Sequence, residues 1–269
     1  MMCERRRRAS LLLAIAALTF LVTTQAGAQR GQGAPAPQAP PTPKADAAID
    51  ITGTWVSVIS EDWALRMVTP HKGDYTRVPI TPAARKIADA WDPARDEAAG
   101  EGCKGYGAVG IIRLPGRLRI GWQDDRTMKL EFEAGNQTRL FHFGAVSPSA
   151  VPPNAVSSSA VPSTAEPSWQ GQSVAEWQYT VNPPRSGELK VLTSRLRPGY
   201  VRKNGVPYSA STTMTEYYHR MTAPNGDVWL TIVTETKDPE NLREPFVQST
   251  HFKKLPANAT FKPEPCEAR

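Results

Sequence analysis

Apolar and polar residues alternate over many short stretches of this chain. The stretch 128–133 (MKLEFE) is strictly alternating, with Met128, Leu130 and Phe132 on one face and charged residues on the other. Such a period of two predicts a strand that is half buried. Other stretches rich in β-branched and aromatic residues predict further strands at 54–60, 106–113, 117–122, 137–143, 173–181, 188–195, 212–221, 228–235 and 247–254. Turn-forming pairs such as Asn204-Gly205 lie between them, which favours hairpin connections.

One segment predicts a helix, near residues 82–91. Thr81 is typical of an N-cap, Pro82 of a first helical position, and Pro93 disfavours continuation. Ile87 and Trp91 are four residues apart, so we expect their apolar stripe to pack on the sheet. The predicted fold class is all-β: an antiparallel β-barrel, or a strongly curled sheet, of about 8–10 strands with one short helix.

The ends of the chain and one internal segment lack such patterns. Residues 1–28 carry four arginines before an apolar run and end in Ala26-Gly27-Ala28, which predicts a secretory signal cleaved near Ala28/Gln29. A retained membrane anchor and a twin-arginine signal are the alternatives. Residues 29–48 are rich in Pro, Ala and Gln, and 145–167 in Ser, Pro and Ala, so we expect a disordered spacer and a disordered loop. This leaves 49–269 as a single barrel-like domain, exported to the periplasm or outside the cell, with no transmembrane segment in the mature chain.

Cleavage changes the charge balance. The whole chain has 32 Lys+Arg against 26 Asp+Glu, but the signal removes four Arg and one Glu, leaving 28 against 25. A net charge near +3 gives no reason to expect a nucleic-acid partner. Cys3 leaves with the signal, so Cys103 and Cys266 remain as an even pair in an oxidising compartment. We expect them to form a structural disulfide, and the alternative of a metal site has no neighbouring ligand in the sequence.

Gly53-Thr54-Trp55 at the start of the first predicted strand resembles the signature of the lipocalin and wider calycin family. The resemblance implies a barrel that holds a small apolar ligand in its lumen, with the Trp closing one end and a late cationic residue packed on it, for which Arg220 and Lys253 are the candidates. The chain departs from the family because its helix follows the first strand and not the eighth. The stretches 61–67, 196–208 and 238–246 resemble a group of uncharacterised exported bacterial proteins, which implies export and no particular activity.

Several groups of residues are candidates for chemistry. His142, His219 and Glu216 are the acid–base candidates of an enzyme hypothesis, but we assign no catalytic residue, metal or cofactor. The paired carboxylates at 61 and 62 suit a glycosidase, but adjacent strand residues face opposite ways, so we expect a salt bridge from one of them to Arg66. The basic cluster of Arg195, Arg197, Arg202 and Lys203 we interpret as a solvated hairpin tip, with an anion-binding loop stacking a ring on Tyr200 and Tyr208 as the alternative.

The sequence is best interpreted as an exported protein that binds a small apolar or amphipathic molecule. The candidate ligand-binding residues are Trp55, Trp122, Tyr200, Arg197, Tyr217 and His219. The alternatives are a structural or envelope-associated interaction domain and a barrel-scaffold enzyme of unknown reaction. The ligand and the oligomeric state are left open.

Overall fold

The computed structural model describes residues 40–144, 166–180 and 186–268. The predicted signal, most of the spacer and nearly all of the predicted 145–167 loop therefore lie outside the described residues. The compact unit begins at residue 41. Residues 41–48, which composition assigns to the spacer, form turns in which Pro43 is buried and accepts a hydrogen bond from Trp177 Nε1 at 2.8 Å.

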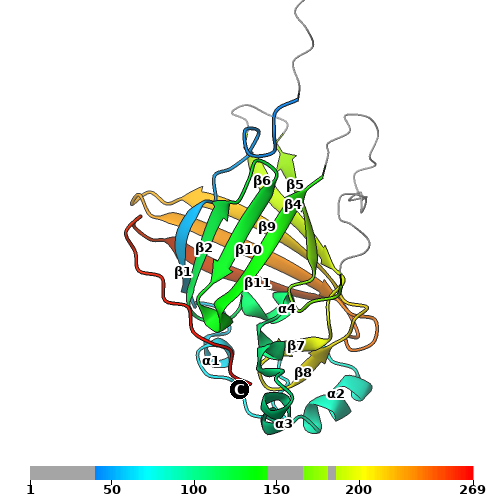
Figure 1. Ribbon diagram of the computed structural model, residues 1–269. Helices are drawn as coiled ribbons and strands as arrows, with labels where there is room; N and C mark the ends of the chain where they lie inside the picture. Colours follow the sequence, from blue (N-terminus) through cyan, green and yellow to red (C-terminus); the bar gives the residue numbers. More distant parts are fainter. Residues whose placement is uncertain (1–39, 145–165, 181–185, 269) are drawn as a thin grey trace, which may run out of the picture. The chain divides into compact units, whose positions relative to one another are not determined.

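Nine strands close into a barrel in the order β1-β11-β10-β9-β6-β5-β4-β3-β2 (Figure 1). The barrel strands are β1 (Gly53–Val58), β2 (Arg117–Trp122), β3 (Thr127–Phe132), β4 (Gln137–Phe143), β5 (Gln172–Tyr179), β6 (Gly187–Ser194), β9 (Thr213–Thr222), β10 (Val228–Lys237) and β11 (Phe246–Lys254). The predicted barrel is confirmed, but the expectation of a wholly antiparallel sheet is wrong because β4 and β5 pair in parallel. A parallel pair needs a long crossover, and the chain between β4 and β5 is long enough to supply one.

The alternating side chains of these strands fill the barrel. Met128, Leu130 and Phe132 of β3 are buried, as the period of two predicts. They belong to an apolar core to which most of the barrel strands contribute. Trp55 lies in this core, donates from Nε1 to Ile51 O at 2.9 Å, and has the ammonium group of Lys254 5.5 Å from its ring centroid. The cation over the Trp is thus Lys254, and neither Arg220 nor Lys253.

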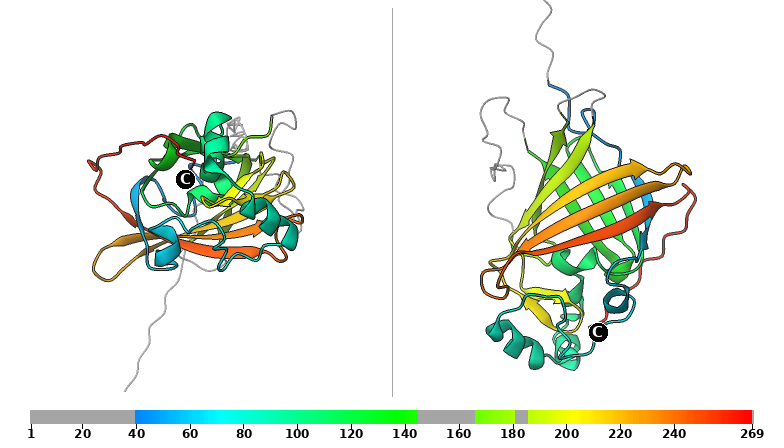
Figure 2. Two further views of the ribbon diagram at one scale, coloured as in Figure 1. Left: turned by 90° about the horizontal axis from the view of Figure 1, so that it is seen from below. Right: turned by 180° about the vertical axis from the view of Figure 1, so that it is seen from behind.

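A cap covers the lower opening of the barrel, and its helical content corrects the prediction of a single helix (Figures 1 and 2). The cap consists of α1 (Trp63–Arg66), α2 (Pro82–Asp89), α3 (Pro93–Ala98), η1 (Gly102–Tyr106), α4 (Ala108–Ile111) and a hairpin of β7 (Gly199–Arg202) and β8 (Val206–Tyr208). A further short 3-10 turn, η2 (Ala134–Asn136), joins β3 to β4.

The segment 106–113, predicted as a strand, is η1 and α4 instead. Ile111 and Ile112 pack into the barrel core, whereas Ala108 and Val109 belong to a second apolar core beneath it. The helix therefore closes the barrel and joins the cap to it. Gly110 permits the close packing here, because a Cβ at this position would lie 3.1 Å from the carbonyl oxygen of Tyr200 in β7, a tight contact.

Helix α2 confirms its predicted cap but not its predicted face. The Thr81 hydroxyl accepts a hydrogen bond from Ala84 N at 3.1 Å. The buried residues are Ala84 and Ala88, while Ile87 is 52% exposed. The helix packs against β8 of the hairpin through small side chains, not against the barrel sheet through an Ile–Trp stripe.

The predicted disulfide between Cys103 and Cys266 is present, with the two Cα atoms 5.1 Å apart. It joins η1 to the chain after β11, which has no regular secondary structure and is also held by Glu133, whose backbone oxygen accepts from Glu264 N at 2.8 Å. The C-terminal segment is thereby fixed beside the cap.

Candidate functional site: an arginine-lined pocket beneath the barrel

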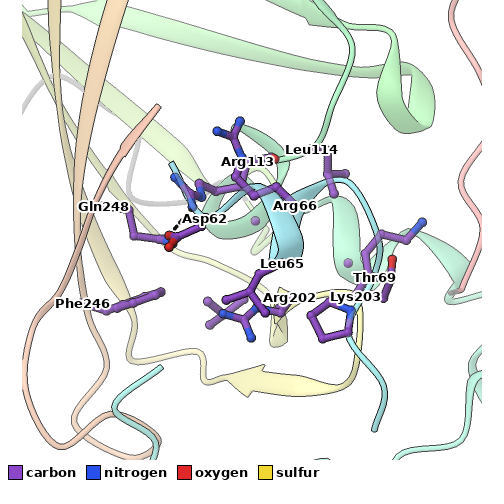
Figure 3. A pocket seen from close by; sticks show the side chains of 14 residues that line it. Asp62, Leu65, Arg66, Thr69, Arg113, Leu114, Arg202, Lys203, Phe246 and Gln248 are labelled. Atoms are coloured by element: carbon purple, nitrogen blue, oxygen red, sulfur yellow. Dashed lines mark hydrogen bonds and ion pairs between the residues drawn. The ribbon is translucent and has the colours of Figure 1, made fainter. Parts of the chain in front are cut away.

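A small pocket of about 50 Å³ lies between the barrel floor and the cap (Figure 3). Its walls come from α1 and the residues after it, from α4, from β7 and from the lower end of β11, which contributes Phe246 and Gln248. Four cationic side chains line it against one carboxylate: Arg66, Arg113, Arg202 and Lys203 against Asp62. The volume suits a few water molecules or one small polar group, and it is far below that of a site for a drug-sized ligand.

The single turn of α1 places Arg66 in the pocket. Asp62, which precedes the helix, has a left-handed backbone (φ 52°, ψ 29°), so the chain turns sharply at the end of β1. The Arg66 side chain is almost fully buried; its Nε donates to Arg113 O at 3.0 Å and one terminal nitrogen contacts Glu61. Burial, together with the neighbouring charge of Arg113, lowers the pKa of Arg66 to about 10.

Arg113 binds both carboxylates that precede α1. Its Nη2 donates to Asp62 Oδ2 at 2.8 Å and its Nη1 lies 3.4 Å from Glu61 Oε1. The salt bridge expected from Arg66 to one of these carboxylates is also present, and its partner is Glu61. Glu61 and Asp62 do not face opposite ways as expected, because they lie after β1 in a turn and both contact Arg113.

Glu61 has two further partners besides the arginines. Its Oε2 accepts from Ser60 Oγ at 2.9 Å and lies 3.0 Å from His251 Nδ1. Burial raises the pKa of Glu61, but hydrogen bonds from its own backbone, His251 and Ser60 and the charge of Arg66 outweigh burial and lower it overall. Glu61 is thus held as a carboxylate that orients Arg66 and Arg113.

The hairpin supplies the other two cations. Arg202 donates from Nη2 to Thr76 O at 3.1 Å. Burial lowers the pKa of Arg202, and repulsion from Arg113 lowers it further. Attraction to Asp74 acts in the opposite direction but does not outweigh burial. Lys203 donates from Nζ to Tyr106 OH at 2.7 Å, with its ammonium group 4.6 Å from the centroid of that ring. Of the basic cluster predicted at the hairpin, Arg202 and Lys203 reach the pocket.

Two buried guanidinium nitrogens at this pocket have no hydrogen-bond partner among the described residues: Arg66 Nη2 and Arg202 Nη1. A buried donor without a partner costs about 1–3 kcal/mol, and more when it carries charge. The pocket therefore combines an excess of positive charge with donors that a small anion can satisfy.

The predicted ligand-binding residues do not gather at one place. Trp55 and Trp122 are in the lumen, where Trp122 packs on Phe143 with ring centroids 5.3 Å apart. Tyr200 is in the cap and donates to Asp96 Oδ2 at 2.7 Å. The Arg197 guanidinium is 4.5 Å from the ring centroid of Trp169. The remaining two, Tyr217 and His219, alternate with the buried residues of β9 and so face away from the core. None of the six lines the arginine pocket.

The lumen contains a buried ion pair. Glu216 of β9 accepts hydrogen bonds from Arg139 of β4 at 2.9 and 2.5 Å and from Tyr218 OH at 3.0 Å, and both charged side chains are fully buried. Burial, reinforced by the charge of Glu216, raises the pKa of Tyr218 well above its ordinary value, so the phenol stays protonated and donates. Side chains thus occupy the middle of the barrel, where the lipocalin resemblance implies a ligand.

The acid–base candidates of the enzyme hypothesis are not brought together. Glu216 is committed to Arg139 in the lumen, whereas His219 lies on the outer face and pairs with Glu188 at 3.0 Å. His142 alternates with the buried residues of β4, which is separated from β9 by β5 and β6. Among the described residues no group of three His, Cys, Asp or Glu side chains is placed to hold a metal ion.

Comparisons with protein-family models, with curated proteins and with solved structures found no match. Within the described ranges, the helices are all too short or too polar to cross a membrane.

Sequence reasoning identified part of this pocket and missed part of it. The sequence predicts Arg202 and Lys203 as members of a basic cluster and Arg66 as an ion-pair partner, but it predicts Arg113 on a strand. No pattern in the sequence links Arg113 to Glu61 and Asp62, from which it is separated by 52 and 51 residues.

Proposed function

We propose that this is an exported binding protein for a small molecule with an anionic group, which the arginine pocket holds. The single observation that carries the proposal is that Arg66 and Arg202 line one pocket and each keeps a buried guanidinium nitrogen without a partner in the described chain. Guanidinium groups are suited to planar, bidentate recognition of carboxylate and phosphate oxygens.

The surrounding carboxylates support binding and not simple charge neutralisation. Glu61 and Asp62 hold Arg66 and Arg113 in fixed orientations, so these side chains need no further ordering when a ligand arrives. Preorganisation of this kind increases affinity because less conformational entropy is lost on binding. The small volume restricts the bound part of the ligand to a single oxyanion-sized group.

Titration of the isotopically labelled protein with sodium acetate and sodium phosphate, followed by amide NMR at constant ionic strength, tests the proposal. We expect saturable shifts at Gly105 and Gly110, which line the pocket, and none with neutral acetamide. Arg202→Gln should abolish them, whereas Arg95→Gln, the same change at an exposed position on α3, should leave them intact. Weak shifts spread over surface cations, equal in both variants, would refute an anion site here.

A further inference from the structure

The stretch 63–68, which is helix α1 and the two residues after it, carries a buried cation and exposed apolar side chains. Arg66 points into the pocket, while Trp63, Met67 and Val68 are 66%, 59% and 69% exposed. Large exposed apolar side chains are few in the described chain, and three of the seven fall within these six residues. Exposed apolar groups gathered beside a polar pocket are typical of a ligand surface.

A wider hollow of about 440 Å³ lies beside the pocket on this face of α1. It is lined by Trp63 and Ala64 and includes Asp62 and Leu65, which also line the arginine pocket. The two spaces therefore share part of their walls, and the remaining lining of the hollow is Ser60, Thr76 and Arg77. A volume of this size is in the range that holds a small organic ligand, which the arginine pocket alone is not.

The hollow that adjoins the pocket on its other flank has a different character. It measures about 360 Å³, shares Arg66 and Lys203 with the pocket, and is lined by Met67 as well as by Glu264 and Glu267 of the C-terminal segment. Two carboxylates make that side less favourable for an anionic or apolar group. The apolar side along α1 is the better path for the rest of a ligand whose anionic end is bound.

We propose that the ligand is amphipathic, with an oxyanion head in the arginine pocket and an apolar chain of several carbons in the hollow along Trp63, Ala64 and Leu65. This inference rests on the proposed function and names its ligand class. It places the apolar part of the ligand outside the barrel, against α1, where the lumen side chains need not move.

A homologous series of straight-chain carboxylates from acetate to octanoate, titrated below their aggregation concentrations, tests this class. Each buried methylene should tighten binding about three- to fourfold until the hollow is filled. Octyl phosphate serves as the second oxyanion head, and octylammonium as the cation of equal chain length, which we expect not to bind. Trp63→Ser should flatten the chain-length dependence, and Ile87→Ser, at another exposed apolar position on α2, should preserve it.

The outcomes separate the two proposals. If acetate and octanoate bind equally well and both depend on Arg202, the apolar site is refuted while the anion site stands. If neither binds, both fail. If octylammonium binds as well as octanoate, the head site is wrong and the protein has only an apolar surface. A chain-length dependence that Trp63→Ser leaves unchanged would also overturn the placement along α1.

Discussion

The buried pair of Arg139 and Glu216 allows a quantitative test of the claim that side chains, and not a ligand, fill the barrel. Glu216→Gln preserves shape and removes the charge. In the folded protein Glu216 accepts two hydrogen bonds from Arg139 and one from Tyr218. The amide can accept at only one atom and turns an NH₂ group toward the guanidinium or the phenol.

The expected loss follows from this geometry. Arg139 would keep its contact with Thr193 Oγ1 at 3.1 Å but would lose its only counter-charge while fully buried. Removing one partner of a buried pair costs about 3–5 kcal/mol, because the other charge is left uncompensated. Replacing both together, as Arg139→Met with Glu216→Leu, should recover most of this loss, since no charge then remains to be solvated.

Urea unfolding followed by tryptophan fluorescence and far-ultraviolet circular dichroism measures these differences. Glu188→Gln is the matched control, because it removes a carboxylate from a half-exposed pair with His219 and should change stability by less than about 1 kcal/mol. If Glu216→Gln costs no more than the control, the pair is solvated. The lumen would then contain water and would again be a candidate ligand cavity.

Three further predictions concern the scaffold. Replacing Cys103 and Cys266 by Ser should lower stability by at most about 5 kcal/mol, because the bridge closes a separation of 163 residues; equal urea midpoints with and without the bridge would contradict this. Thr81→Ala should cost about 1 kcal/mol and Thr81→Ser much less, as thermal unfolding would show, since only the hydroxyl caps α2. Burial raises the pKa of Asp238, but hydrogen bonds from Asn241 and Ser209 outweigh burial and lower the pKa overall. The ionised carboxylate therefore stabilises the folded protein above the unfolded pKa of about 3.9, and this contribution is lost as pH falls through the folded pKa. Asp238→Asn should therefore show a shallower loss of unfolding free energy below about pH 4, and parallel pH profiles would argue against it.

The barrel strands could be predicted because their environment has two sides. In β3 and β9 one face meets the core and the other meets solvent, so residues such as Met128 and Lys129 alternate along the chain. The parallel pairing of β4 with β5 could not be predicted in this way. Alternation records which face is buried and contains no information on the direction of the neighbouring strand.

The cap is harder to predict from the sequence because parts of it are buried on every side, so apolar and polar residues do not alternate there. Helix α4 is buried all round, so residues 108–111 show no period of 3.6, and a short apolar run of this kind is also compatible with a strand. Helix α2 buries the face with Ala84 and Ala88 because these small side chains allow close approach to the hairpin. Gly205 of the hairpin lies so close to Trp91 that a Cβ there would clash with the ring. Packing of small residues decided the face, and hydrophobicity alone did not predict it.

The pocket illustrates why the arginines could be noted singly but not assembled. Arg66 and Arg113 meet across 47 residues, and their meeting depends on the left-handed turn at Asp62. Arg77, which also has a positive φ of 67°, contacts the same carboxylate. A non-glycine residue in this region costs on the order of 1–3 kcal/mol and persists where its surroundings fix it. Asp62 is thus held by Arg113 inside the pocket and by the exposed Arg77 outside it. Carboxylates fix the arginines on one side of the pocket, while buried nitrogens of Arg66 and Arg202 lack partners among the described residues. A bound anion would complete this arrangement.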